Sequence, residues 1–593
     1  MKAIFLERST ELSRRLAFVL TLLMGITVAF VLYELFFLFS AQIWDCYKRI
    51  DPLTLTPSLR QWVYEHDGIE AYVLYLFALC GMGGAAFLTS SRALQGRGQL
   101  TIKPLNGLFY LVATMVFFIS IGLNFPMPAK AHGLSLWLAC TEVLILLYLL
   151  YKISCLSKLW STVLVMVLLA PLCFIATKPI SLLDYSFIFS PAYRLIHHAK
   201  LENIYFQYDL FMPLLAAGWM KLGLDANDFQ IIPRLSIYLF CIGLFVYARR
   251  YFSKPLPYVL LAALIIIKIY AIPNGDLAAS IQITPLRLDL WLLLLFIVAE
   301  KGVYSKWLGC GLGGMAIIHH NFGIFYILSY LELSAALFLI DHADHVHTKS
   351  MTFIALIRKH FILTLPNLVL IGCGLLTYNF LFHSTVSEGI EIYKTLGVGF
   401  LRVSNVSFYW YVLALQCVTI GLLLQNRKNF STNYLASGLF LLFIVTANSL
   451  YFFGRSHEWN LLNISASIVL TFFLFLDILY KTYLDSNPQS VDFRLKQRLL
   501  RAAPSVFVLV MGIVYSERIV TSTQLQITNL MQGKFQYPMS AKDIDANNLS
   551  HQQLGEKIFN IDSLKSITHG SNKVYILSYL PMQFTDLTTT YSV

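Results

Sequence analysis

Apolar residues in this chain come in blocks of about 18–24, separated by short polar segments, and this is the length that a helix needs to cross the hydrocarbon of a bilayer. The shorter alternating strands of a membrane β-barrel are absent from the pattern. The sequence therefore predicts an all-α polytopic membrane protein with about 15 transmembrane helices. The expected spans are 17–40, 70–90, 104–124, 133–151, 159–177, 231–249, 256–273, 285–300, 306–320, 322–340, 361–380, 406–424, 433–453, 461–482 and 502–518.

The composition supports this class and excludes others. Hydrophobic residues make up 57% of the chain and charged residues 13%, whereas soluble proteins carry about 25% charged residues. The formal net charge of +12 is explained by cationic cytoplasmic loops, so it does not indicate a nucleic-acid partner. The nine cysteines form no CxxC pair, which argues against a disulfide framework or a cysteine-based metal site.

Lysine and arginine are denser in the alternate loops that share a side with the N-terminus, which places that side in the cytoplasm. An odd number of spans then puts the C-terminus outside. We expect a four-span block over 1–156, a larger core over 157–518 and a short extracytoplasmic tail over 519–593. The core carries a long external loop, 178–230. Within that loop, the apolar run 210–222 is too short to span and suits an interfacial or re-entrant helix.

Nucleotide and hydrolase motifs are missing: the chain has no GxxxxGK[ST], no HExxH and no GxSxG following a strand. Polar residues instead concentrate in the external loop, where Asp184, Arg194 and His197 precede Asp209 among aromatic residues. Such a cluster at the interface can meet both a lipid-linked and a water-soluble substrate. The competing interpretation is an interfacial aromatic belt with solvated polar groups, in which Asp209 is the N-cap of the following helix.

A second constellation lies in the short external loop after span 433–453. Arg455, His457 and Asn460 are held there between two helices, and arginine binds phosphate through paired hydrogen bonds. The alternative is a tight turn between helices. Arg287 and Asp289, at the outer end of span 285–300, either pair with each other or complete the same site.

Polar residues also occur within the apolar stretches. His319, His320 and Asn321 interrupt one of them, and adjacent histidines cannot both face one way on a helix. We expect the helix to break there. The polar side chains then either hydrogen-bond the backbone groups that the break leaves unpaired or take part in the function. Lys268 and Asp477 lie close enough to span ends to reach water by extending along the helix.

Several of these features occur in the same order in a known family. The order is an acid soon after a span, then Pro191-Ala-Tyr-Arg-Leu-Ile196, then the helix-like run from Asp209 to Gly223. Ile232-Pro-Arg-Leu-Ser236, Pro285-Leu-Arg-Leu-Asp289 and Gly311–Gly314 with His319-His-Asn-Phe-Gly323 follow. This order over 157–480 resembles the C-type (GT-C) integral-membrane glycosyltransferases, which include protein O-mannosyltransferases and lipid A aminoarabinose transferases. The four spans at the front depart from the simplest plan of that family.

The resemblance implies a GT-C-like bundle that transfers a sugar from a polyprenyl-phosphate donor to a glycan, lipid or protein acceptor on the extracytoplasmic face. It implies Asp184 as the catalytic carboxylate, with Asp45 and Asp51 as rivals. Arg194, His197, Asp209, Arg287, Arg455, His457 and Asn460 are the expected substrate-binding residues. The resemblance implies no definite cofactor, and the chemistry leaves room for a divalent metal whose ligands the sequence does not identify. The implied location is a bacterial inner membrane, in contact with its lipids.

Two other functions fit parts of the pattern. A transporter or flippase for a lipid-linked or anionic solute would use the ionisable residues inside spans, such as Glu142 and Glu332. A glycan polymerase or ligase would share the lipid-linked substrate but would have its large external loop late in the chain. The one-sided distribution of polar residues favours the glycosyltransferase.

Overall fold

The computed structural model describes residues 133–177, 182–201, 204, 206, 209–224, 227–271, 276–278, 281–348, 352–395, 409–454, 458–483 and 491–535. Within these ranges all regular elements are helical and no strand occurs, which confirms the all-α expectation for this part of the chain. Three expected spans, 17–40, 70–90 and 104–124, lie outside the described residues. Asp45, Asp51 and the tail beyond residue 535 lie outside them as well.

The described helices follow one another along the chain. They are α5 (Gly133–Ser154), α6 (Lys158–Phe174), α7 (Leu182–Ile196), α8 (Phe211–Lys221), α9 (Ile231–Tyr251), α10 (Leu256–Leu264), α11 (Pro285–Leu288), α12 (Trp291–Lys301), α13 (Lys306–Ile318), α14 (His320–Thr348), α15 (Phe353–Thr395), α16 (Tyr409–Gln425), α17 (Thr432–Gly454), α18 (Glu458–Asn463), α19 (Ser465–Tyr483), α20 (Val491–Val514) and α21 (Ser516–Met531). A π-helical turn, η5 (Ile265–Tyr270), continues α10, and 3₁₀ turns occur at η4 (Asn227–Gln230), η6 (Ile281–Ile283) and η7 (Arg427–Asn429).

Six helices of the described part are long and apolar enough to cross a membrane. These candidate spans are Leu134–Ser154, Asp228–Tyr251, His320–His342, Phe353–Phe382, Thr432–Phe452 and Ser465–Thr482. Shorter apolar helices coincide with other expected spans, so the total of about 15 remains a prediction. The expectation of one continuous span over 502–518 is wrong, because the chain bends by 77° there, between α20 and α21.

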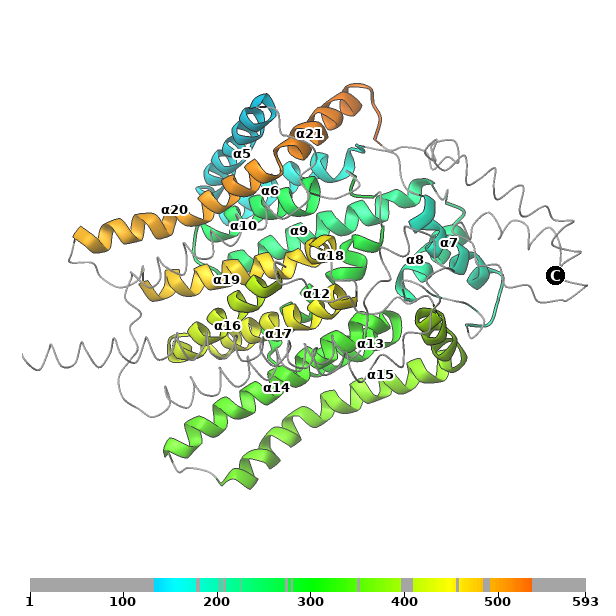
Figure 1. Ribbon diagram of the computed structural model, residues 1–593. Helices are drawn as coiled ribbons and strands as arrows, with labels where there is room; N and C mark the ends of the chain where they lie inside the picture. The colour runs from blue at the N-terminus through cyan, green and yellow to red at the C-terminus, as the bar shows by residue number, and fades with distance from the viewer. Residues whose placement is uncertain are drawn as a thin grey trace, which may run out of the picture.

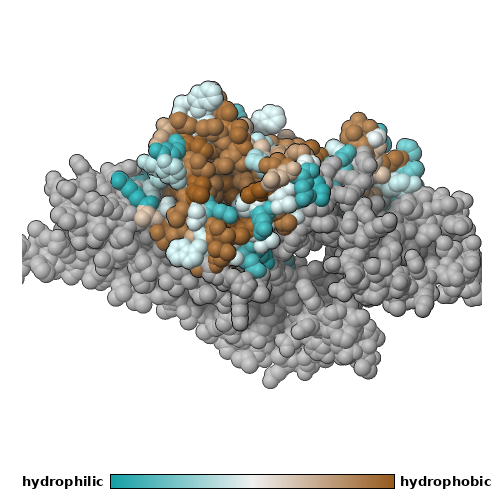
Figure 2. Space-filling view, turned by 90° about the horizontal axis from the view of Figure 1, so that it is seen from above, coloured by the Kyte–Doolittle hydropathy of each residue, from teal (hydrophilic) through white to brown (hydrophobic). Residues whose placement is uncertain are grey.

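The long helices lie side by side, with α7 and α8 at one end of the bundle and α5 and α21 along one edge (Figure 1). Burial separates the centre from the periphery: α17 and α19 are mostly enclosed by other helices, whereas α5 and α15 expose large apolar side chains such as Trp137 and Phe380. Hydrophobic residues cover much of the coloured surface seen from the side of α5 and α21 (Figure 2). Exposed apolar surface of this kind is suited to contact with lipid.

Helices α13 and α15 approach each other more closely than side chains would allow. A Cβ atom at Gly313 would lie 2.6 Å from the carbonyl oxygen of Leu370, and one at Gly374 would collide with the backbone of Gly313. Small residues permit this close packing, which membrane helices use because lipid offers no hydrophobic drive for association. The contact fixes the end of α13, directly before His319.

The C-terminal helix α21 ties several segments together. Thr523 donates a hydrogen bond to Glu142 of α5. Gln526 donates to the carbonyl of Leu172 in the last turn of α6, and Asn529 donates to the carbonyl of Ala176 just after that helix. The first part of the expected tail 519–593 is therefore helical and packs on the bundle. Helix α5 shares the main hydrophobic core with the helices that follow it, and the division into units at 156/157 and 518/519 stays a prediction.

Candidate functional site

Helices α7 and α8 pack on each other at one end of the bundle through a small separate core. Tyr185, Phe189, Met212 and Ala216 are buried there, and Phe229 closes the cluster. Apolar residues at helical spacing on α7 explain this contact, since they form one face of the helix. The Tyr185 hydroxyl donates a 2.8 Å hydrogen bond to the carbonyl oxygen of Ala278, which anchors α7 to the segment before α11.

Helix α7 carries the expected catalytic residue and one expected binding residue, and a second expected binding residue directly follows it. Asp184 belongs to its first turn, next to the buried Tyr185. Arg194 lies in the last turn and is exposed, and so is His197, whose ring centroid lies 4.2 Å from that of Tyr193. The structure thus places Asp184 and Arg194 at opposite ends of one short helix, with Arg194 and His197 exposed.

Asp209 is the one carboxylate among the predicted substrate-binding residues, and it is buried. Its side chain is 7% exposed; Oδ2 lies 2.8 Å from Nδ1 of His319, and Oδ1 accepts a 3.0 Å hydrogen bond from the side-chain amide of Asn321. The interpretation of Asp209 as an N-cap is wrong, because α8 is preceded by Leu210 and has no side-chain cap. The backbone of Asp209 has φ +62°, a left-handed conformation that aspartate adopts more readily than most residues.

His319 and His320 point to different partners, as their adjacency predicted. His319 lies at the break between α13 and α14 and is buried, with its ring edge against Phe322. The ring of His320 stacks on Tyr378 with centroids 3.6 Å apart, and its Nδ1 lies 3.2 Å from the carbonyl oxygen of Ala316. The sequence had singled out this stretch without linking it to Asp209, which is 112 residues away.

Arg287 lies beside the same aromatic ring. Its guanidinium carbon is 5.9 Å from the ring centre of Phe322 and 5.4 Å from that of Tyr451. Since the ring of His319 also contacts Phe322, the predicted residues Arg287 and Asp209 are brought to one end of the bundle by helices far apart in sequence.

Asp289 pairs with a lysine rather than with Arg287. Nζ of Lys268 lies 2.9 Å from Oδ2 of Asp289 and donates a 2.8 Å hydrogen bond to the carbonyl oxygen of Asn463. The indole of Trp291 donates to the other carboxylate oxygen at 3.2 Å. The expectation that Lys268 reaches water is therefore wrong: it is buried in the π-helical turn, where its charge is compensated by Asp289.

A small pocket opens beside this ion pair. It is lined by Lys268, Thr284, Leu462 and Asn463 among others, and its interior has room for water-sized molecules. The predicted binding residue Asn460 is buried one turn away on α18, with its side-chain oxygen 3.5 Å from the amide nitrogen of Asn463. Asn460 therefore belongs to the same end of the bundle as the pocket.

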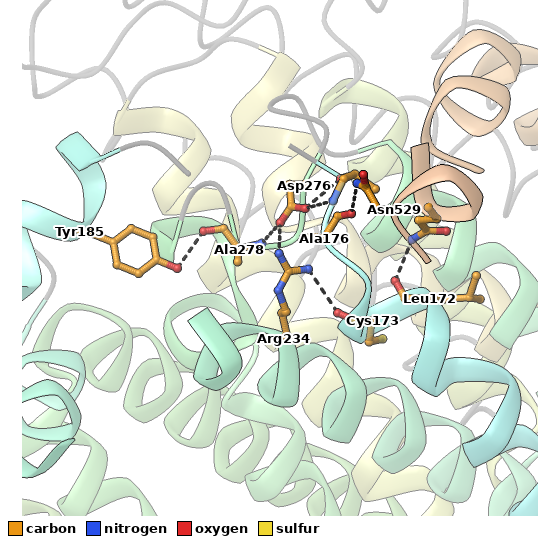
Figure 3. A network of polar contacts seen from close by, with 10 residues as sticks. Leu172, Cys173, Ala176, Tyr185, Arg234, Asp276, Ala278 and Asn529 are labelled. Carbon is orange, nitrogen blue, oxygen red and sulfur yellow. Dashed lines mark hydrogen bonds and ion pairs between the residues drawn. The ribbon is translucent and has the colours of Figure 1, made fainter. Parts of the chain in front are cut away.

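A second buried ion pair organises the base of α7 (Figure 3). Asp276 accepts a 2.7 Å hydrogen bond from Arg234 of α9, and its oxygens also accept hydrogen bonds from both the backbone and the hydroxyl of Thr177. The backbone N–H of Ala278 donates to Asp276 as well. Because Ala278 accepts the hydrogen bond from Tyr185, this network connects α9 to the helix that carries Asp184.

The sequence interpretation missed Asp276 and the pairing of both buried cations. A signal was available, since a charged residue inside an apolar span requires a partner. Arg234 and Lys268 are such residues, but nothing in the spacing indicates which carboxylates pair with them.

The opposite end of the bundle holds its own polar cluster. Asp477 is fully buried, pairs with Lys481 at 2.7 Å and accepts a 2.6 Å hydrogen bond from the hydroxyl of Tyr434, so the expectation that it meets water is wrong. Between α12 and α13, burial and the nearby charge of Asp341 raise the pKa of Tyr304 to about 12. Tyr304 therefore keeps its proton at neutral pH, and its hydroxyl oxygen lies within hydrogen-bond distance of Nδ1 of His360, at 3.0 Å.

Two predicted residues and the metal question remain as expectations. Arg455 and His457 lie outside the described residues, between the end of α17 and the start of α18. Among the residues that the structure describes, no three His, Cys, Asp or Glu side chains are grouped as a metal ion would require. No protein family, curated protein or solved structure matches the chain.

Proposed function

We propose that this helical membrane protein is a glycosyltransferase that moves a sugar from a polyprenyl-phosphate donor to an acceptor at the end of the bundle formed by α7 and α8. The observation that carries the proposal is the convergence of charged and polar groups from distant segments at this end of an apolar bundle. Asp209, His319 and Asn321 contact one another there, and Arg287 shares the ring of Phe322 with His319.

The reaction needs three things from such a site. A carboxylate must accept the proton of the attacking hydroxyl, and the family resemblance gives this role to Asp184 on α7. Cationic donors must stabilise the departing phosphate, for which Arg287 is suited among the described residues. A firm scaffold must hold these groups, and the Arg234–Asp276 network supports the helix that carries Asp184. Arg455 and His457 remain further candidates for the phosphate, and the acceptor is a glycan, lipid or protein.

Reconstituted vesicles with a panel of radiolabelled polyprenyl-phosphate sugars and a mixed acceptor preparation test the proposal. We expect the wild-type protein to consume one donor. Asp184→Asn should reduce the rate by about 10²-fold or more, because the amide cannot take up the proton. Asp228→Asn, an exposed aspartate in the turn before α9, is the matched control and should retain the wild-type rate.

Each outcome assigns the function differently. Donor consumption that is lost only in Asp184→Asn supports both the transferase and its base. Consumption that persists in Asp184→Asn retains the transferase and removes Asp184 as its base. If the wild-type protein consumes no donor, but moves a lipid-linked or anionic solute across the vesicle membrane, the transferase is wrong and the transport alternative holds.

A further inference from the structure

Asp209 and His319 form the arrangement in which a carboxylate orients an imidazole for proton transfer. The carboxylate contacts Nδ1 at 2.8 Å, and Asn321 holds the other carboxylate oxygen through its side-chain amide at 3.0 Å and its backbone N–H at 3.4 Å. Nε2 of His319 makes no hydrogen bond with any residue that the structure describes. In this structure Nδ1 and Oδ2 do not meet in hydrogen-bond geometry, and such contacts at catalytic sites commonly align only when substrate binds. A carboxylate beside Nδ1 and an open Nε2 are the features that proton-transferring histidines share on unrelated folds.

The backbone supports a functional origin for this contact. Asp209 adopts a left-handed φ of +62°, and His319 occupies the irregular turn that separates α13 from α14. Unusual backbone conformations at two contacting residues are maintained when the surrounding structure demands them, and they cluster at functional sites.

We propose that His319 is a catalytic proton donor to the phosphate of the lipid-linked sugar, and that Asp209 is its positioning residue. The inference rests on the proposed function and assigns a role that the sequence resemblance does not give. Arg287 marks where the phosphate binds, because its guanidinium and the His319 ring flank the same Phe322. The Asp209 carboxylate lies beside Nδ1, so Nε2 is the ring nitrogen that remains for the phosphate.

Atoms, protons and electrons balance in the proposed transfer step. The acceptor oxygen bonds to the anomeric carbon while its proton passes to the Asp184 carboxylate. The bond between the anomeric carbon and the phosphate oxygen breaks, and its electron pair stays on that oxygen, which takes the Nε2 proton of His319. The products are the glycoside and a polyprenyl hydrogen phosphate. The proton on Asp184 then returns through solvent to His319, and both groups are reset.

The contacts around His319 come from several segments. Asp209 from the segment before α8 lies against Nδ1, and Arg287 of α11 shares the ring of Phe322 with His319. The charge of Asp209 also acts on His320 and Tyr326 of α14 and on Tyr378 of α15.

The first test is the binding of polyprenyl phosphate to the full chain in lipid nanodiscs, with polyprenol as the uncharged lipid and inorganic phosphate as the soluble competitor. We expect the wild-type protein to prefer polyprenyl phosphate to polyprenol, and His319→Gln to reduce this preference by about tenfold or more. His320→Gln is the matched control, because the neighbouring ring packs on Tyr378, and it should change the preference by less than about twofold. Equal loss in both variants would overturn the proposal.

The second test is the pH dependence of transfer, which a purely structural role would not change. Wild-type activity should fall as pH rises, because His319 loses the proton that it donates. His319→Gln should abolish this limb of the profile. A wild-type limb that persists unchanged in His319→Gln would overturn the proposal.

The two proposals fail in different ways. If the wild-type protein consumes a donor while His319→Gln leaves phosphate binding and the pH profile unchanged, the transferase stands and the role of His319 is wrong. If His319-dependent binding of polyprenyl phosphate is found without consumption of any donor, the phosphate site stands and the transferase is wrong. If inorganic phosphate displaces the lipid completely at equal concentration, recognition of a lipid donor at this site is wrong.

Discussion

Arg234→Met should destabilise the folded protein by about 3–5 kcal/mol, the cost of leaving one member of a buried ion pair without its partner. Arg234 is 3% exposed and Asp276 1% exposed, so the carboxylate cannot recover the lost charge interaction from water. Denaturation of the purified protein in detergent, followed by a fluorescence or circular-dichroism signal, measures the loss. Transfer activity should fall as well, because Asp276 also holds Thr177 and Ala278 at the base of α7.

The control is an ion pair with the same separation but with more exposure to water. Arg250 and Glu300 also lie 2.7 Å apart, but the side chain of Arg250 is 62% exposed. Arg250→Met should cost about 0–1 kcal/mol, since water screens the charges. Similar losses for the two variants would mean that burial does not govern the contribution of Arg234, and would contradict the role assigned to the network in Figure 3.

Lys268→Met should have an effect of similar size, about 3–5 kcal/mol, because it leaves Asp289 charged within the bundle. The indole of Trp291 then remains as a hydrogen-bond donor to that carboxylate. The double variant Lys268→Met/Asp289→Leu should recover most of the loss, since a buried ion pair can be replaced by apolar residues at little cost. The same denaturation measurement compares the single and double variants.

Lys359→Met is the matched control for this second pair. Lys359 lies 3.1 Å from Asp341, with about two fifths of each side chain exposed, and its loss should cost less than about 1 kcal/mol. A double variant as unstable as Lys268→Met would show that the loss comes from packing of the lysine stem. That outcome would contradict the account of Lys268 and Asp289 as a compensated charge pair.

Hydropathy located helices well, because the membrane imposes both their length and their apolar character. The expected spans 133–151 and 231–249 match α5 and α9 within a few residues. Hydropathy did not predict that α20 and α21 meet at a 77° bend, because an apolar window measures composition and not direction. The apolar run at 210–222 predicts a helix that is too short to span the membrane, and the structure has helix α8 at this place.

The sequence identified polar residues of the site but not their partners. Asp209 and Arg287 were selected from their place in the chain, and both lie at the end of the bundle that holds His319. The pairing of Asp209 with His319 and of Lys268 with Asp289 depends on which helix ends meet. Periodicity along one helix carries no such information. Burial of these charges is what distinguishes them from solvated loop residues.

The sidedness of the transfer reaction tests the central claim most directly. Sealed vesicles of known orientation would receive a radiolabelled polyprenyl-phosphate sugar in the membrane and a water-soluble acceptor analogue on one side only. We predict labelled product when the acceptor is on the extracytoplasmic side, opposite the N-terminus, and background levels when it is on the cytoplasmic side. Product formation from the cytoplasmic side, or from neither side with every donor tested, would contradict the proposal of an extracytoplasmic glycosyltransferase site at the α7–α8 end.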